Sequence, residues 1–467
     1  MNHNSKLVRN TIIYGIGNLG SKILSYVMVL VYSYYITPEE LGYYDVVLTT
    51  ISMLQPLIIC QINEGVFRFL LDSNAEENKD VIGGSIKFLC LTTLVSEIIF
   101  GIFCLFVNVN YSLSIALLLI TSIFFSLFQD VVRGLGKNNE YALYGVLNSV
   151  VMLFIEIIGL IVFKLGVRAL IISKVFAYGV CVLVIYIKHP EFKASLKLKY
   201  NLIKLKEMLK YSLPLVPNTI CWWVVNSSDR YIILFSLGAS YNGLYSMATK
   251  FPTILTTITS IFYLAWQESA IKAYGSSDCD KFFSSIFRKY YILLFTLCIC
   301  AIPITKIVIE LFVSNLYIDA WKYTGFLYLG AVFSALSSFL GIGYQISKET
   351  SKSVVTTIFA AFINFAINIL FIQVIGLQAA SLSTFLAYFF LVFIRIKHSK
   401  RYFTLNVKWM EFYMLFVISI IYILVILNVS SLYFSIILEV ISIVIFLKFN
   451  YQIIEPYLKK FFIKENK

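Results

Sequence analysis

Charged residues are scarce in this chain of 467 residues, where Asp, Glu, Lys and Arg together make up 13%. Soluble domains carry about 25% charged residues, so an ordinary soluble enzyme is excluded. Histidine is scarcer still, with three residues far apart in the sequence: His3, His189 and His398. They give no basis for a metal centre or a catalytic triad, and no cofactor is expected.

Cysteine and glycine are present without the patterns that would give them a chemical role. The eight cysteines show neither disulfide nor zinc spacing, which excludes a secreted disulfide scaffold. Gly15, Gly17 and Gly20 match the dinucleotide-binding fingerprint, but they fall within an apolar helical run and not in a βαβ unit. No glycine-rich loop ends in Lys-Ser or Lys-Thr, so ATP is not expected to be the direct energy source.

Apolar residues are abundant, at 59% of the chain. A helix that crosses a bilayer needs about 20 mostly apolar residues. Runs of this kind predict an all-α membrane protein with about fourteen transmembrane helices. The runs cover residues 10–36, 41–70, 82–107, 112–134, 139–163, 167–187, 210–237, 242–270, 283–312, 322–346, 352–375, 377–397, 409–428 and 431–452.

Lysine and arginine are distributed unevenly over the segments that join these runs. We place 30 of the 38 on one side, including five from Arg395 to Lys408, and three on the other side: Lys164, Arg168 and Lys322. Cytoplasmic loops carry the excess of Lys and Arg, so both termini of this multi-pass plasma membrane protein are predicted to be cytoplasmic. The net charge of +13 then anchors loops to anionic lipids, and no nucleic acid partner is expected.

The longest cytoplasmic connection divides the chain. We predict an N-terminal six-helix bundle at 1–187, a basic linker at 188–209, a C-terminal six-helix bundle at 210–397, and helices 13 and 14 with a cytoplasmic tail at 398–467. A shift of 201 residues places Gly42-Tyr43-Tyr44 on Gly243-Leu244-Tyr245. Both halves begin on the same side, so they are predicted to be pseudo-symmetric parallel repeats.

Polar residues recur at helical spacing on one face of four of these runs. A polar stripe facing lipid is costly, so these helices are predicted to line a central cavity between the halves. The alternative for any single Ser or Thr is a bond to its own backbone or to a neighbouring helix. The stripes are Asn18, Lys22 and Ser25; Asp45, Thr49 and Ser52; Thr219, Trp223, Asn226 and Arg230; and Ser246, Lys250, Thr253, Thr257 and Ser260.

Cations within the runs have the strongest claim to a function, since a charge at the bilayer centre costs about 2.5–3.5 kcal/mol. Lys22 lies near mid-membrane, whereas Arg230 and Lys250 lie nearer the outer surface. A cavity with these cations would bind an anionic headgroup. The predicted substrate-binding residues are Lys22, Arg230, Lys250, Asn18, Asn226, Asp229 and Thr253, with no catalytic or metal-binding residue.

Several short motifs resemble those of a known family. They are Tyr211-Ser212-Leu213-Pro214-Leu215-Val216-Pro217, Ser228-Asp229-Arg230-Tyr231, Gly243-Leu244-Tyr245-Ser246-Met247-Ala248 and, near the start, Glu39-Glu40-Leu41-Gly42-Tyr43-Tyr44-Asp45. The chain resembles the bacterial oligosaccharide and polysaccharide flippases, in the superfamily shared with multidrug and toxin extrusion transporters and the lipid II flippase.

This resemblance covers essentially the whole chain and implies two six-helix bundles in a V shape, followed by two further helices. It implies movement of polyprenyl-pyrophosphate-linked oligosaccharide units from the inner to the outer leaflet by alternating access, for a surface polysaccharide such as capsule or O-antigen. The implied partners are the lipid-linked oligosaccharide, membrane lipids, a polysaccharide polymerase and glycosyltransferases.

The driving force and the function class leave alternatives open. An inside-negative potential favours outward movement of negative charge by about 2.3 kcal/mol per charge per 100 mV, and coupling to Na⁺ or H⁺ is equally open. A cation-coupled multidrug antiporter would share the architecture but favour acidic groups in its cavity. A glycosyl polymerase or ligase usually carries a large outer loop, which these short loops lack. An assembly scaffold would give Lys22 no role.

Overall fold

The computed structural model of the protein describes residues 26–72, 75–196, 201–347, 349–429 and 431–464. These residues are almost entirely helical, and no strand occurs among them. Asn18, Lys22 and the glycine motif at 15–20 lie outside the described residues. Contacts divide the chain into two compact units, Met1–Trp223 and Val224–Lys467, which are described separately here. The domain boundaries predicted at residues 187, 209 and 397 stay a prediction.

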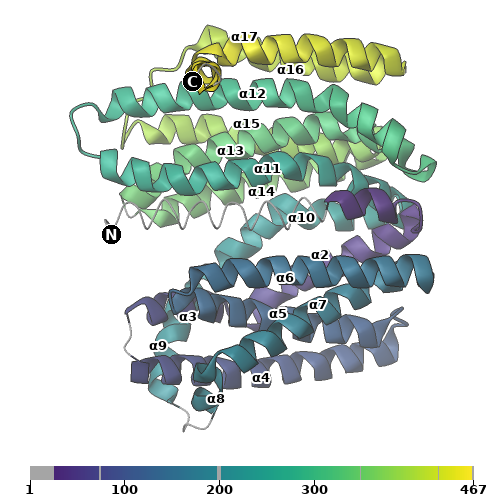
Figure 1. Ribbon diagram of the computed structural model, residues 1–467, viewed down its shortest axis with the longest axis vertical. Helices are drawn as coiled ribbons and strands as arrows, with labels where there is room; N and C mark the ends of the chain where they lie inside the picture. Colours follow the sequence, from purple (N-terminus) through teal and green to yellow (C-terminus); the bar gives the residue numbers. More distant parts are fainter. Residues whose placement is uncertain (1–25, 73–74, 197–200, 348, 430, 465–467) are drawn as a thin grey trace. The chain divides into compact units, whose positions relative to one another are not determined.

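The described helices of the first unit follow the predicted runs closely (Figure 1). They are α2 (Pro38–Ile58), α3 (Ile62–Asp72), α4 (Ala75–Phe106), α5 (Ser112–Gly134), α6 (Asn138–Ile157), the π-helical turn η1 (Ile158–Val162), α7 (Val167–Lys188), α8 (Pro190–Leu196), α9 (Leu202–Ser212) and the 3₁₀ turn η2 (Leu213–Leu215). The segment predicted as a linker thus contains α8 and most of α9.

The remaining helices begin with α10 (Val216–Ser236), which crosses the boundary between the units. They continue with α11 (Ala239–Ala273), α12 (Cys279–Phe312), the 3₁₀ segment η3 (Asn315–Tyr323), α13 (Thr324–Ile346), α14 (Thr350–Ile375), α15 (Leu377–Ser399), α16 (Trp409–Asn428) and α17 (Leu432–Lys464).

Ten of the described helices are long and apolar enough to cross a bilayer, and there are eleven if the bent pair α2–α3 is one span. Helices α10 and α11 lie where spans were predicted, but polar residues keep them below the hydropathy of the others. Most of the run at 10–36 lies outside the described residues. The prediction of an all-α multi-pass membrane protein is confirmed, with a span count close to fourteen.

The run at 41–70 was expected to be one helix, but the structure bends it by 57° between α2 and α3. At the break, Cys60 and Gln61 adopt left-handed backbone conformations, with φ of 51° and 53°. Ser212 donates a hydrogen bond to the carbonyl of Cys60 (2.8 Å), and the Gln61 amide donates to the Thr219 hydroxyl (2.7 Å). Neither Cys60 nor Gln61 is a typical helix breaker, so the sequence did not reveal the bend.

The second unit is built around α13, which packs against α11, α12 and α15 (Figure 1). In its apolar window 78% of the residues are buried, compared with 11% in α4 of the first unit. Since a span has lipid wherever it lacks protein neighbours, α13 is a core helix and α4 is largely lipid-facing. The centre of the second unit is therefore the place where polar side chains can be kept from lipid.

The C-terminal pair α16–α17 packs against α12 and is fixed to it by polar contacts at both ends (Figure 1). At one end Arg288 makes two hydrogen bonds to Glu411, of 2.8 and 3.1 Å. At the other end Lys306, which is fully buried, donates to the carbonyl of Val429 (2.6 Å). The pair is therefore an integral part of the second unit.

Candidate functional site

A cavity of about 130 Å³ opens within the second unit, among α10, α11, α13 and α15. We call it the charged cavity, because it is the one with an ion pair in its wall. Its lining residues are Asn226, Asp229, Arg230, Tyr245, Thr249, Pro252, Thr253, Thr256, Leu327, Gly330, Ala331, Ser334, Thr384 and Tyr388.

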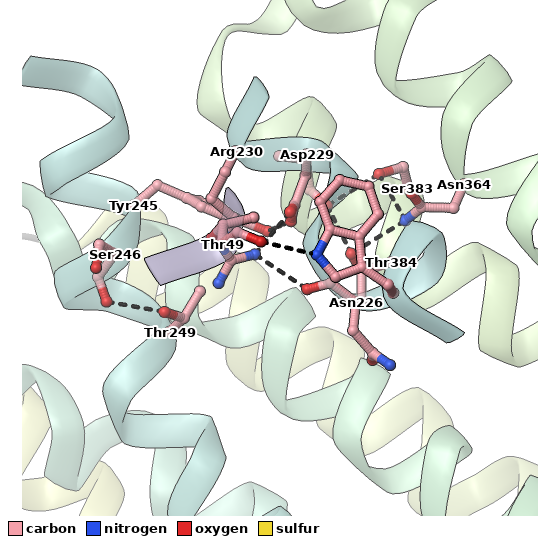
Figure 2. A network of polar contacts seen from close by, with 12 residues as sticks. Thr49, Asn226, Asp229, Arg230, Tyr245, Ser246, Thr249, Asn364, Ser383 and Thr384 are labelled. Carbon is pink, nitrogen blue, oxygen red and sulfur yellow. Dashed lines mark hydrogen bonds and ion pairs between the residues drawn. The ribbon is translucent and has the colours of Figure 1, made fainter. Parts of the chain in front are cut away.

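The ion pair joins two neighbours on α10. Arg230 Nη1 lies 2.6 Å from Asp229 Oδ1, and Tyr245 of α11 donates its hydroxyl to Asp229 Oδ2 (2.7 Å). The guanidinium carbon also lies 5.2 Å from the centre of the Tyr245 ring. Figure 2 shows these three side chains converging. The Asp229 side chain is 2% exposed and that of Arg230 13%, so the pair is mostly shielded and its two charges balance.

Hydrogen bonds fix the polar wall around this pair. Arg230 Nη1 also donates to the carbonyl of Asn226 (3.3 Å), and the Tyr388 hydroxyl donates to Asn226 Oδ1 (2.6 Å). Behind the wall, Asn364 of α14 donates to the hydroxyl of Thr384 (3.2 Å), as Figure 2 shows. The wall is thus held from three helices and is pre-organised for a polar ligand.

The structure brings together four of the seven predicted site residues: Asn226, Asp229, Arg230 and Thr253 all line the charged cavity. Lys250 is half-buried one turn away on α11, and its carbonyl accepts the hydroxyl of Thr253 (2.5 Å), but it is not among the lining residues. Asn18 and Lys22 lie outside the described residues. That any of the seven binds substrate stays a prediction.

The polar face of α11 is rotated relative to the predicted stripe. Ser246 and Thr257 were expected on the cavity face, but they are 0% and 4% exposed. They line neither the charged cavity nor the second cavity that adjoins it. The lining face runs through Thr249, Thr253, Thr256, Ser260 and Tyr263, at the same spacing of four and three. Because two polar faces of one helix have the same period, the sequence could not tell which of them faces the cavity.

A second cavity of about 210 Å³ adjoins the first and shares Thr256 and Ser334 with it. We call it the hydroxyl cavity, because seven of its eight lining residues carry a hydroxyl group. They are Thr256, Thr259, Ser260, Tyr263, Tyr290, Ser334, Ala335 and Ser338. Together the two cavities reach the lower end of the volume range of small-molecule sites, about 300 Å³.

Arg395 is a charged residue whose burial was not predicted. It was counted among the cations of the cytoplasmic segments, but it lies within α15, near its C-terminal end, and is 2% exposed. Its guanidinium donates to the carbonyl of Ser337 (2.8 Å) and to hydroxyls of α14, including Thr357 (3.2 Å). A Cβ on Gly341 would lie 3.0 Å from its Nη1. An arginine at the end of an apolar run is typical of a loop at the membrane surface, so the sequence could not predict that the Arg395 side chain is buried.

The charge of Arg395 has no carboxylate partner within the part of the chain that the structure describes. Its electrostatic neighbours are the tyrosines Tyr263, Tyr344 and Tyr388. Tyr388 lines the charged cavity and Tyr263 the hydroxyl cavity. With Asp229 and Arg230 balancing each other, Arg395 is a further positive charge, and its electrostatic interactions reach one residue in each cavity wall.

No group of three or more His, Cys, Asp or Glu side chains that could hold a metal ion occurs among the described residues. The one carboxylate on the charged cavity's wall, Asp229, is already bonded to Arg230 and Tyr245. The two cavities therefore offer hydrogen bonds, and the charged cavity also offers a guanidinium group.

The sequence model of the family described as polysaccharide biosynthesis protein matches residues 7–267, which include α10 and most of α11. The chain belongs to the polysaccharide biosynthesis protein family. The match contains the ion pair and all the α11 residues that line the two cavities. A comparison with curated proteins found no match.

Solved structures show which fold this family member has. The lipid II flippase MurJ in an inward closed conformation superposes with a TM-score of 0.73 at 16% identity, covering 96% of this chain and 100% of MurJ. An inward-facing multidrug resistance MATE family transporter of the MOP superfamily gives 0.67 at 14% identity, covering 86% and 95%. A MOP superfamily transporter from Pyrococcus furiosus gives 0.58 at 15% identity, covering 84% and 95%. The fold is therefore the one that these flippases and transporters share.

Proposed function

We propose that this protein is a flippase that moves polyprenyl-pyrophosphate-linked oligosaccharide units from the inner to the outer leaflet of the plasma membrane by alternating access. The family description supports a role in polysaccharide biosynthesis, and the shared fold supports a transporter and not an enzyme. Both termini are cytoplasmic in this proposal, because the cytoplasmic side carries the excess of lysine and arginine. Glycosyltransferases would supply the substrate and a polymerase would use it.

The observation that carries the proposal is the buried positive charge of Arg395 in the second unit. Arg395 has no carboxylate partner among the described residues, and its electrostatic neighbours include Tyr388 and Tyr263 of the cavity walls. A pyrophosphate group is anionic, and it gains from a positive potential in a medium of low dielectric constant. A cationic drug would be repelled there, since Asp229 is neutralised by Arg230. This favours the flippase over the multidrug antiporter.

Reconstitution tests the proposal directly. Proteoliposomes with the purified protein and a polyprenyl-pyrophosphate-linked oligosaccharide should expose the labelled sugar to an impermeant enzyme faster than empty liposomes do. The same preparation should not expel a cationic dye when a pH or Na⁺ gradient is applied. Dye efflux without lipid movement would contradict the flippase and support the antiporter.

Lys22, Arg230 and Lys250 are proposed to contact the anionic headgroup. Lys22→Ala should abolish glycan export at unchanged protein level, whereas Lys22→Arg should keep part of the activity, because the charge is retained and the geometry is not. Lys250→Ala should have a smaller effect, because that position lies nearer the outer surface. Export assays with membrane-fraction immunoblots measure both, and normal export by Lys22→Ala would contradict the charge-based mechanism.

A further inference from the structure

The hydroxyl cavity offers a ligand something different from the charged cavity beside it. Among the described residues, its wall contains no Asp, Glu, Lys or Arg side chain, and only Ala335 lacks a hydroxyl group. An ionic group would lose its hydration here without meeting an opposite charge, which is unfavourable. The cavity therefore suits an uncharged, polar ligand.

The hydroxyl groups of this wall are arranged so that most of them accept hydrogen bonds. Thr256, Thr259 and Ser260 of α11 each donate their hydroxyl proton to a carbonyl three residues earlier, at 2.7 to 3.0 Å. Ser338 of α13 donates in the same way to Ser334 (3.0 Å). Since a hydroxyl has one proton and two lone pairs, these four groups keep acceptor capacity for a ligand.

Two tyrosines supply donors to the same cavity. The Tyr263 hydroxyl accepts from the Gln345 amide (3.0 Å), which leaves its own proton to donate. Tyr290 is 95% buried, and no described residue bonds its hydroxyl. Its ring stacks on Phe262 with centroids 4.0 Å apart, which fixes its orientation. A hydroxyl on a fixed ring at the cavity wall, without a bond to a described residue, is available to a ligand in that cavity.

From this wall we infer that the hydroxyl cavity is the subsite for a sugar residue of the substrate. Each sugar hydroxyl both donates and accepts, and this wall offers acceptors from α11 and α13 together with donors from Tyr263 and Tyr290. The inference rests on the proposed function and extends it. Thr256 and Ser334 belong to both cavities, so one ligand can place a pyrophosphate in the charged cavity and its attached sugar in the hydroxyl cavity.

Paired variants on α13 give the sharpest test. Ser337 and Ser338 both donate their hydroxyl to the carbonyl of Ser334, but only Ser338 lines the cavity, and Ser337 is fully buried. Ser338→Ala should weaken sugar binding and Ser337→Ala should not. Thr259→Val and Thr257→Val form the same pair on α11, because Thr259 lines only the hydroxyl cavity and Thr257 is the buried control. Tyr290→Phe removes the hydroxyl that lacks a protein partner and keeps the ring.

The measurement compares two probes on the full-length protein in lipid nanodiscs. One probe is a short-chain polyprenyl pyrophosphate, and the other is the same lipid carrying one sugar, tested over a panel of glucose, galactose and N-acetylglucosamine. The protein should bind at least one glycosylated probe more tightly than the bare one. Each cavity variant should reduce that gain by roughly two- to tenfold, the range expected for one lost neutral hydrogen bond, and leave binding of the bare lipid unchanged.

The outcomes separate the subsite from the function. If no sugar improves binding, or if control and cavity variants behave alike, the sugar subsite is wrong while the flippase proposal stands on lipid movement. If neither probe binds and no lipid moves in proteoliposomes, the proposed function itself fails. The double variant Asp229→Asn/Arg230→Gln should weaken binding of both probes equally, because it removes the guanidinium of the charged cavity and no lining group of the hydroxyl cavity.

Discussion

Asp229 and Arg230 line the charged cavity, and as an ion pair they also stabilise the fold. Asp229 is almost fully buried, and its partners are Arg230 and Tyr245. Truncating one partner of a buried pair leaves the other charge uncompensated, which costs about 3–5 kcal/mol. A loss of transport in a single Arg230 variant would therefore mix two effects, a lost substrate contact and a destabilised helix.

A double-mutant cycle separates these effects. Arg230→Gln should lower the free energy of unfolding by about 3 kcal/mol, because it leaves a buried carboxylate without its cation. Asp229→Asn/Arg230→Gln should be more stable than Arg230→Gln alone. Thermal unfolding in detergent at one protein concentration measures the four proteins of the cycle. Additive effects of the two substitutions would mean that the pair contributes no coupling energy.

His189 is a second residue whose environment predicts a measurable property. It follows the span of α7, is almost fully buried, and lies between Lys137 Nζ (3.0 Å from Nδ1) and the Tyr144 hydroxyl (3.0 Å from Nε2). Burial, together with the charge of Lys137, lowers the pKa of His189 below its ordinary value of 6.5, while Glu140 and Glu191 oppose the shift. The surroundings of this histidine in the folded protein therefore disfavour its protonated form.

A lowered pKa in the folded state gives stability that is present above pH 6.5 and is lost as the pH falls from there towards the folded-state pKa. The wild-type protein should lose more thermal stability between pH 7.5 and pH 5 than His189→Gln does. Melting temperatures over this pH range in one ionic strength give the comparison. Parallel profiles would contradict the prediction and would show that Glu140 and Glu191 cancel the combined effect of burial, Lys137 and Lys188.

At the scale of the element, the break between α2 and α3 concentrates strain in two residues. A non-glycine residue in the left-handed region costs roughly 1–2 kcal/mol, and here Cys60 and Gln61 adopt it in succession. The bonds from Ser212 and to Thr219 hold the break in place. Both partners belong to the segment from α9 to α10, so this segment fixes the bend of a helix far from it in sequence.

Substitutions at Cys60 should reveal the strain. Cys60→Gly should be neutral or stabilising, because glycine adopts positive φ without penalty, whereas Cys60→Ile should destabilise by more than about 1 kcal/mol, because a β-branched residue is an outlier there. Cys90, which lies within α4, is the matched position. There glycine should destabilise by about 1 kcal/mol. Thermal unfolding of these three variants and of the wild-type protein gives the comparison, and equal effects of glycine at both positions would argue against strain at the break.

The sequence predicted where the helices lie better than it predicted which face of a helix lines a cavity. The run at 112–134 coincides with α5 and the run at 409–428 with α16, because long apolar runs leave little choice of structure in a bilayer. The cavity face of α11 and the burial of Arg395 could not be predicted in the same way, since both depend on which helices pack together. Asp229 and Arg230 are adjacent in the sequence, so a balance of their two charges could be foreseen, and the structure shows that they pair.

At the scale of the whole molecule, the distribution of Lys and Arg predicts which surface faces the cytoplasm. The turn at 275–278 should lie on the cytoplasmic side and the segment η3 on the outer side, because the first lies between Lys272 and Lys281. In a cysteine-free background, an impermeant maleimide should label Leu316→Cys in intact cells. It should label Ser277→Cys and Lys467→Cys only after permeabilisation. Labelling of Lys467→Cys in intact cells would contradict cytoplasmic termini.

The hydroxyl groups of α11 have a consequence for how such a protein can change over evolutionary time. Because Thr256, Thr259 and Ser260 bond carbonyls of their own helix, none of these protein bonds joins two helices, and exchange for alanine leaves the helix ladder complete. Single substitutions along this wall can therefore alter what a ligand meets without first requiring a compensating change elsewhere. In the proposed sugar subsite, such a lining would separate selectivity from folding, so that new glycan preferences could arise one nucleotide change at a time.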